Sequence, residues 1–134
     1  MSIASAIAIS GLNAADLRLQ VAASNIANLR SDCSLPGAPN PEDVPPAYST
    51  LRVTQADIVG GGTRATVVAG SPATVQSYDP SAFFADANGM VASPNVDLAD
   101  EFVQLMIARY TFAANAQVVR VDTQLSASIL NITA

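Results

Sequence analysis

Proline and glycine are confined almost entirely to the middle of this 134-residue chain. All eight prolines lie between Pro36 and Pro94, and six of the seven glycines lie in the same stretch. Proline removes a backbone donor and glycine adds backbone freedom, so both residues interrupt helices. We therefore expect three segments: a helical segment over 1–30, a β-rich middle over 31–94 and a second helical segment over 95–134.

The first segment is predicted to form one long helix over residues 3–28. Only Asp16 and Arg18 are charged within it, so most of its surface is poorly suited to water. Modest side chains recur at heptad-like spacings, in the order Ile3, Ile7, Ala14, Leu17, Val21 and Ser24. Such a stripe predicts that this helix pairs with another helix.

The last segment is predicted to form a longer helix over residues 97–132. Pro94 precedes it, Asp97 is suited to the N-cap position, and Asp100 and Glu101 favour the positive end of the helix dipole. Its apolar stripe drifts slowly around the helix, as a 3.6-residue period predicts. The stripe begins with Phe102, Leu105, Phe112, Ala116 and Val119 and continues with Val121, Leu125, Ile129 and Ile132.

The middle segment is predicted to hold a loop followed by short strands. Residues 32–47 contain five prolines and read as an extended arm. Runs typical of strands follow at 48–58, 63–69 and 73–78, and the glycines at 60–62 predict a hairpin between the first two. The expected fold is α+β: two long terminal α-helices, paired like a coiled coil, flank a small β-rich lobe.

Composition limits both the core and the chemistry of the chain. Half of the residues are hydrophobic but only 5% are aromatic, so a core built largely from alanine would be thin. The chain has no histidine and no lysine, and Cys33 is its single cysteine. We therefore expect no catalytic site, no metal site and no cofactor, and we expect Cys33 to be an ordinary loop thiol.

The charge and the N-terminus exclude further classes of protein. A formal charge of −5 without a basic cluster argues against binding to nucleic acid. The apolar start of the chain lacks a basic flank, so we expect neither a cleaved signal peptide nor insertion into a membrane. A calcium loop at Asp86 is also disfavoured because Phe84 occupies a required ligand position, and a tight turn is expected at 86–89.

Two sets of motifs resemble the flagellar basal-body rod protein family, and most closely its proximal-rod type, FlgC. The first set is Ser-Gly-Leu-Asn-Ala at 10–14 followed by Val-Ala-Ala-Ser-Asn-Ile-Ala-Asn at 21–28. The second is Tyr-Asp-Pro at 78–80, Pro-Asn-Val-Asp-Leu at 94–98 and Phe-Ala-Ala-Asn-Ala-Gln-Val at 112–118. Phe112 and Met90 stand where that family has tyrosine.

The resemblance implies a structural subunit of the basal-body rod, not an enzyme. Such a subunit is exported by the flagellar type III apparatus without signal cleavage and lies in the periplasmic space. Its terminal helices polymerise into the hollow, torque-transmitting drive shaft. The implied partners are copies of itself, other rod proteins, the surrounding ring proteins and the export machinery. Another flagellar axial protein, or a cytoplasmic helical export chaperone or adaptor, is the alternative.

The residues expected to carry assembly contacts lie on the two terminal segments. Asn25 and Asn115 are open to two interpretations: buried amides that fix the register of helices, or polar residues that face water. Asn28 is expected instead at a helix end. The full set is Leu12, Leu17, Val21, Asn25, Ile26, Asn28, Asn95, Val96, Leu98, Phe102, Leu105, Phe112, Asn115, Val119, Leu125 and Ile129.

Overall fold

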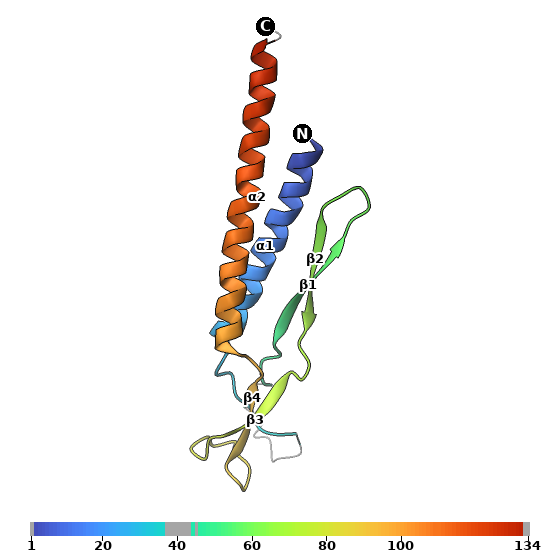
Figure 1. The fold of residues 1–134 in the computed structure, drawn as a ribbon. Coiled ribbons are helices and arrows are strands. Elements are labelled where there is room, and N and C mark those ends of the chain that lie inside the picture. The colour runs from blue at the N-terminus through green and yellow to red at the C-terminus, as the bar shows by residue number, and fades with distance from the viewer. Residues whose placement is uncertain (1, 37–43, 45, 133–134) are drawn as a thin grey trace.

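Two long antiparallel helices dominate the structure, and two small antiparallel sheets accompany them (Figure 1). The structure is a computed structural model and describes residues 2–36, 44 and 46–132. The predicted α+β class with two terminal helices is confirmed. In chain order the elements are α1 (Ile3–Ala27), β1 (Leu51–Asp57), β2 (Thr63–Ala69), β3 (Thr74–Tyr78), β4 (Met90–Pro94) and α2 (Leu98–Ile132).

Both helices begin and end within one residue of the predicted positions, and polar side chains explain three of these four ends. The Ser2 hydroxyl accepts a hydrogen bond from the Ser5 amide and caps the start of α1. The Asp97 carboxylate accepts from the amides of Ala99 and Asp100, so Asp97 caps α2 as predicted. The side chain of Asn28 closes the end of α1.

The β1–β2 hairpin runs along α1 (Figure 1). Its open end, at Leu51, lies beside Asn25 near the end of α1, and its turn lies beside Ser10, nearer the start of α1. Its register pairs Leu51 with Ala69 and Asp57 with Thr63. The three glycines at 60–62 all have φ between 96° and 100°, a backbone region that only glycine adopts readily. The predicted glycine hairpin is therefore confirmed.

The second sheet, β3–β4, lies below the foot of the helix pair, which is the end where α1 finishes and α2 begins (Figure 1). Cys33 extends it by a bridge to Ala92, in which each residue's amide donates to the other's carbonyl. The sequence did not predict β4, because its adjacent buried residues Val91 and Ala92 hide the alternation of a half-buried strand. The middle of the chain thus divides into two hairpins that lie in different places.

The core is thin and made mostly of alanine, as composition predicted. Among the described residues, Val91 and Asn25 are the largest side chains that are fully buried. The buried apolar residues are Ala8, Ala14, Ala15, Val21, Ala22, Val44, Val91, Ala92 and Ala108. Alanine buries little area, so this fold gains limited stability from its own core and leaves much apolar surface exposed.

Candidate functional site

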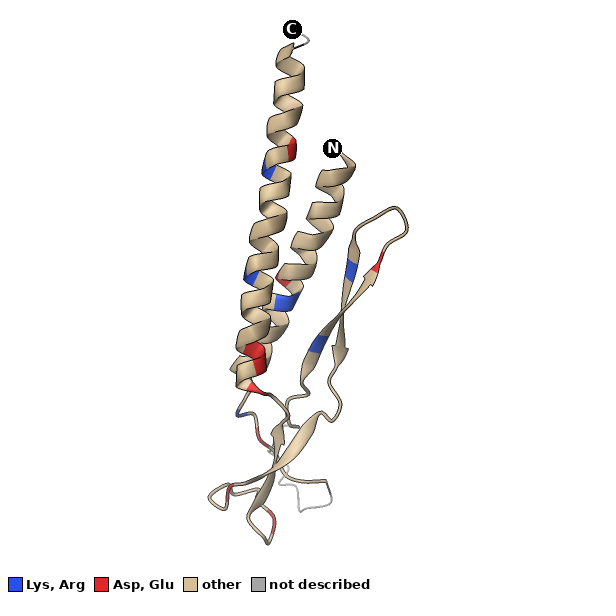
Figure 2. Cartoon of the chain, viewed as in Figure 1, with Lys and Arg blue, Asp and Glu red and all other residues tan. Residues whose placement is uncertain are grey.

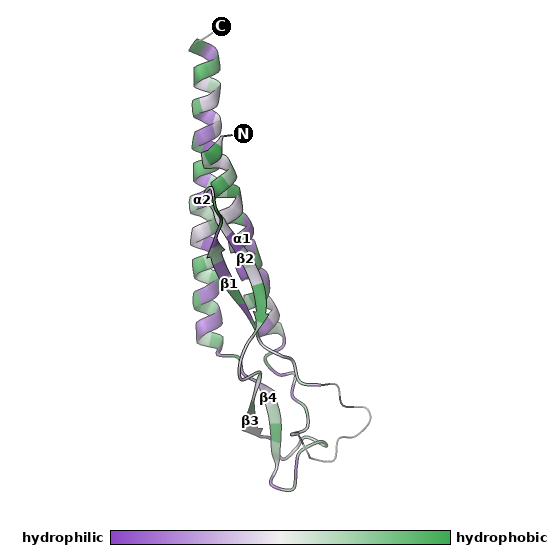
Figure 3. Cartoon of the chain, turned by 90° about the vertical axis from the view of Figure 1, so that its right-hand side faces the viewer, coloured by the Kyte–Doolittle hydropathy of each residue, from purple (hydrophilic) through white to green (hydrophobic). Residues whose placement is uncertain are grey.

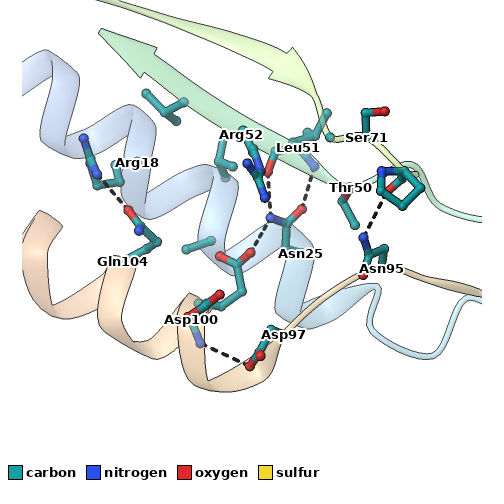
Figure 4. Close-up of a pocket in the computed structure, with 16 residues that line it drawn as sticks. Arg18, Asn25, Thr50, Leu51, Arg52, Ser71, Asn95, Asp97, Asp100 and Gln104 are labelled. Carbon is teal, nitrogen blue, oxygen red and sulfur yellow. Dashed lines mark hydrogen bonds between the residues drawn. The ribbon is translucent and has the colours of Figure 1, made fainter. Parts of the chain in front are cut away.

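A buried polar junction joins α1, β1 and the start of α2 (Figure 4). Asn25 is 1% exposed, and its amide nitrogen donates to the Leu51 carbonyl at 2.9 Å and to the Glu101 carboxylate at 2.7 Å. Its amide oxygen accepts from the Tyr48 hydroxyl and the Leu51 amide, each at 3.0 Å. A buried amide with all these partners holds three elements in one arrangement. Asn25 is therefore a buried amide and not a residue that faces water.

Glu101 takes part in this junction as well as in the first turn of α2. Its partial burial raises the pKa of its carboxyl group, although the hydrogen bond from Asn25 acts in the opposite direction. Repulsion from Asp100 raises the pKa further, while Arg52 lowers it. Sequence reasoning assigned Glu101 only to the helix dipole, because nothing in the sequence indicates that Asn25 lies against it.

A polar hollow of about 510 Å³ opens beside the junction, between α1, β1 and the foot of α2. Arg18 and Arg52 line it together with Asp97, Asp100 and Glu101 (Figure 4). In the part of the chain that the structure describes, no three histidine, cysteine or acidic residues gather where a metal ion could bind. The hollow can therefore offer hydrogen bonds and charges, but its lining contains no thiol or imidazole for nucleophilic chemistry.

The β1–β2 hairpin covers a second side of α1. At its tip, the Thr63 amide donates to the Ser10 hydroxyl at 3.0 Å, and Gly61 approaches the Ile7 side chain. Near its middle, Arg18 donates to Gln104 of α2 at 2.7 Å and to Gln55 of β1 at 2.9 Å. Helix α1 is consequently held between α2 and the hairpin.

Helix α2 extends beyond the N-terminal end of α1 (Figures 1 and 3), and many of its large apolar side chains are exposed. Ala108 is its only buried residue within the described range. A row of exposed side chains follows the helical period along one side of α2. The large apolar members of this outer α2 stripe are Val103, Ile107, Tyr110, Val118, Val121, Leu125, Ile129 and Ile132.

Charged residues are sparse along α2 beyond its first turn (Figure 2). Acidic residues gather at the foot of α2, and Arg109 and Arg120 lie farther along the helix. Asp122 accepts from the hydroxyl of Ser5 at the other end of α1. Hydrogen bonds from Ser2 and Ser5 lower the pKa of Asp122.

The predicted assembly residues divide into three groups by burial. Val21 and Asn25 are buried. The half-buried group comprises Leu12, Leu17, Ile26, Asn28, Val96, Leu105, Asn115 and Val119. The exposed group comprises Asn95, Leu98, Phe102, Phe112, Leu125 and Ile129. Only the exposed group and the outer faces of the half-buried group are accessible to another molecule in this structure.

Asn28 has a local role, whereas Asn115 also meets the other helix. Asn28 donates to the Ser24 carbonyl at 2.9 Å, which agrees with the expected position at a helix end. Asn115 donates to the Thr111 carbonyl of its own helix, and its amide group packs directly over Gly11. A Cβ atom at Gly11 would lie 2.6 Å from the Asn115 side-chain oxygen. Glycine at this position therefore permits the close approach of the two helices.

Comparisons with known proteins bear on this architecture. Residues 87–132, which include β4 and α2, match the family described as flagellar basal body rod FlgEFG protein C-terminal. The chain is 36% identical over 138 residues to a flagellar basal-body rod protein FlgC from Agrobacterium fabrum, covering 98% of this chain and 94% of that protein. The chain belongs to the family of FlgC flagellar basal-body rod proteins.

The chain is also similar to other FlgC proteins over most of its length. The chain is 36% identical over 112 residues to a FlgC protein of Salmonella typhimurium, covering 84% and 82% of the two chains. It is 32% identical over 132 residues to one from Yersinia enterocolitica, covering 94% and 92%. The chain is thus a structural subunit of the flagellar basal-body rod, a family whose members assemble with other rod components. None of the described helices is long and apolar enough to cross a membrane.

Proposed function

We propose that this FlgC-family chain enters the hollow rod chiefly through the outer α2 stripe, while α1 serves as the internal support of the subunit. The observation that carries the proposal is the contrast in burial between the two helices. Alanines of α1 are enclosed by α2 and the hairpin, whereas Tyr110, Leu125 and Ile129 of the stripe are each more than half exposed. Large apolar surfaces of this kind usually mark contacts with other proteins.

The shape of the stripe favours a helix as its partner. Exposed large apolar residues recur every three or four positions from Val103 to Tyr110 and from Val118 to Ile132, and the exposed Ala114 lies midway between the two runs. Together they form a nearly straight band along α2. At about 1.5 Å per residue this band is roughly 43 Å long. A second apolar helix can cover such a band along its whole length by packing ridges into grooves.

The proposal also covers the partners of the chain, its location and its route of export. Its partners are copies of itself, other rod proteins and the ring proteins around the rod, and it has no catalytic role. Its site of action is the rod in the periplasmic space, reached through the flagellar type III export machinery without cleavage of a signal. Closely packed terminal helices provide the stiffness that torque transmission requires, and heterologous contacts between subunits extend the assembly.

A matched pair of double variants tests the proposal. Val118→Asp with Val121→Asp places two charges on the outer α2 stripe, where these valines are 45% and 42% exposed. Val68→Asp with Val75→Asp places the same charges at strand positions that are 40% and 43% exposed. Each variant is expressed in a strain that lacks the native rod protein, and swimming in soft agar is measured.

The α2 variant is expected to abolish swimming and incorporation into basal bodies, because charges cannot be buried in an apolar helix contact. The strand variant is expected to retain both. Far-UV circular dichroism of the purified chains checks that helix content is unchanged. Normal swimming by the α2 variant would refute the proposed role of the stripe.

A further inference from the structure

The apolar seam between the two helices does not by itself define their register. Ala8, Ala15 and Ala22 recur every seven residues along α1, and each is no more than 3% exposed. A slide of α2 by one heptad, about 10 Å, would bring it against the same ladder of alanines. On the α1 side, small side chains with equal spacing offer the same apolar surface to either arrangement.

Two asparagines distinguish between these arrangements. Asn25 meets Glu101, and Asn115 packs over Gly11. From Gly11 to Asn25 the chain advances by 14 residues, and from Glu101 to Asn115 it also advances by 14, so both contacts belong to one antiparallel register. Near the top of α1, Ser5 donates to Asp122 in a third contact of the same register.

A slide of one heptad would break these contacts. It would replace Glu101 by Ala108 or Pro94 opposite Asn25, depending on its direction. Neither side chain can accept a hydrogen bond, so a donor of the buried Asn25 amide would lose its partner. The amide of Asn115 would also leave the gap above Gly11.

We propose that Asn25 and Asn115 specify the register of α1 against α2 and thereby fix how far α2 extends beyond the end of α1. Opposite Ser5 lies Asp122, so about eight residues of α2, roughly 12 Å, extend past the start of α1. This extension carries Leu125 and Ile132, which are 59% and 84% exposed. Use of the extension by a neighbouring subunit rests on the proposed function, whereas the register itself does not.

Distances between two spin labels in the isolated full-length chain test the register. Labels are attached at Ala23→Cys on α1 and Gln124→Cys on α2, both exposed, in a Cys33→Ser background. The native register places these positions roughly 30 Å apart along the helix axis, and a heptad slide changes that separation by about 10 Å. Pulsed electron resonance resolves such a change.

The parent chain is expected to give one narrow distance distribution. Asn25→Leu combined with Asn115→Leu is expected to add a second population displaced by about 10 Å, because leucine keeps the side-chain volume without the polar contacts. Asn13→Leu combined with Asn88→Leu is the control, since both positions are exposed, and it is expected to match the parent.

A broad distribution in the parent, or an unchanged one in the Asn25 and Asn115 double variant, would overturn the inference. If that variant loses its helix signal, Asn115→Leu alone provides the test, and a minor displaced population is expected. As a second readout, hydrogen exchange at the Leu51 amide, which donates to Asn25, should accelerate in the double variant. A shifted register with normal motility would leave this inference standing and count against the proposed function.

Discussion

The two helices of this chain are both rich in alanine and other apolar residues, but one is largely covered and the other is largely exposed. Helix α1 has 25 residues and buries seven of them, whereas α2 has 35 residues and buries only Ala108. The cause is the β1–β2 hairpin, which packs on α1, whereas the only described element packed along α2 is α1. An apolar helix becomes core or assembly surface according to what the rest of the chain places against it.

The largest expected effect comes from shortening α2. A chain that ends after Gln124 loses the exposed extension but none of the buried residues described for α2. We expect complete loss of swimming in a complementation assay, while the urea unfolding midpoint of the purified chain changes little. Full-length Ser126→Ala, a change within the same segment, is the control. A motile truncated strain would show that the extension is dispensable.

Replacing Asn25 or Asn115 by alanine compares the buried junction with a half-buried position on α2. Asn25→Ala leaves the Leu51 backbone groups and the Glu101 carboxylate without their partner, so a loss of about 3 kcal/mol is expected. Asn115→Ala removes a bond to Thr111 of its own helix and the contact over Gly11, but Asn115 is only half-buried, so a loss of less than about 1 kcal/mol is expected. Urea denaturation measures both values, and equal losses would contradict the contrast.

Replacing one alanine by leucine in each helix measures how tightly that part of the helix is packed. Ala22 of α1 is 1% exposed, whereas Ala113 of α2 is exposed. Ala22→Leu is expected to destabilise the chain by about 1–3 kcal/mol, because a packed seam has no room for the added atoms. Ala113→Leu is expected to change stability by less than about 0.5 kcal/mol. Thermal unfolding followed by circular dichroism would reveal whether the two helices respond alike.

The smallest expected effect is a change in how the stability of the fold depends on pH, caused by Glu101 in the buried junction. Because the pKa of Glu101 is raised in the folded chain, the folded state holds a proton that the unfolded state releases. Its contribution to stability therefore falls as pH rises from the ordinary glutamate pKa through the raised value. Glu101→Gln still offers an oxygen to Asn25, so the variant should show a flatter curve on the acidic side of neutrality.

Asp122 is expected to affect the pH dependence of stability in the opposite direction to Glu101. Its pKa is lowered, so its contribution to stability is present above the ordinary aspartate pKa and is lost as pH falls through the lowered value. Asp122→Asn should therefore reduce the loss of stability in acid, whereas Glu101→Gln should not. Unfolding midpoints measured between pH 3 and pH 7 distinguish the two slopes, and matching slopes would contradict both assignments.

Much of the fold was predictable because its signals are local. The restriction of proline and glycine to the middle placed both helices within one residue of their observed ends, and Asp97 marked the start of α2. The glycines at 60–62 predicted the turn between β1 and β2. Backbone freedom, missing donors and capping oxygens act within a few residues, so they can be recognised in a single sequence.

Only the tertiary structure decided which apolar surfaces are covered and what the polar residues contact. The sequence left Asn25 and Asn115 with two interpretations each, and gave no sign that the hairpin lies on α1. Asn25 meets Glu101, 76 positions away, and Ser5 meets Asp122, 117 positions away. Such contacts depend on where distant segments meet, and an alanine-rich stripe does not encode this because many partners would fit it equally well.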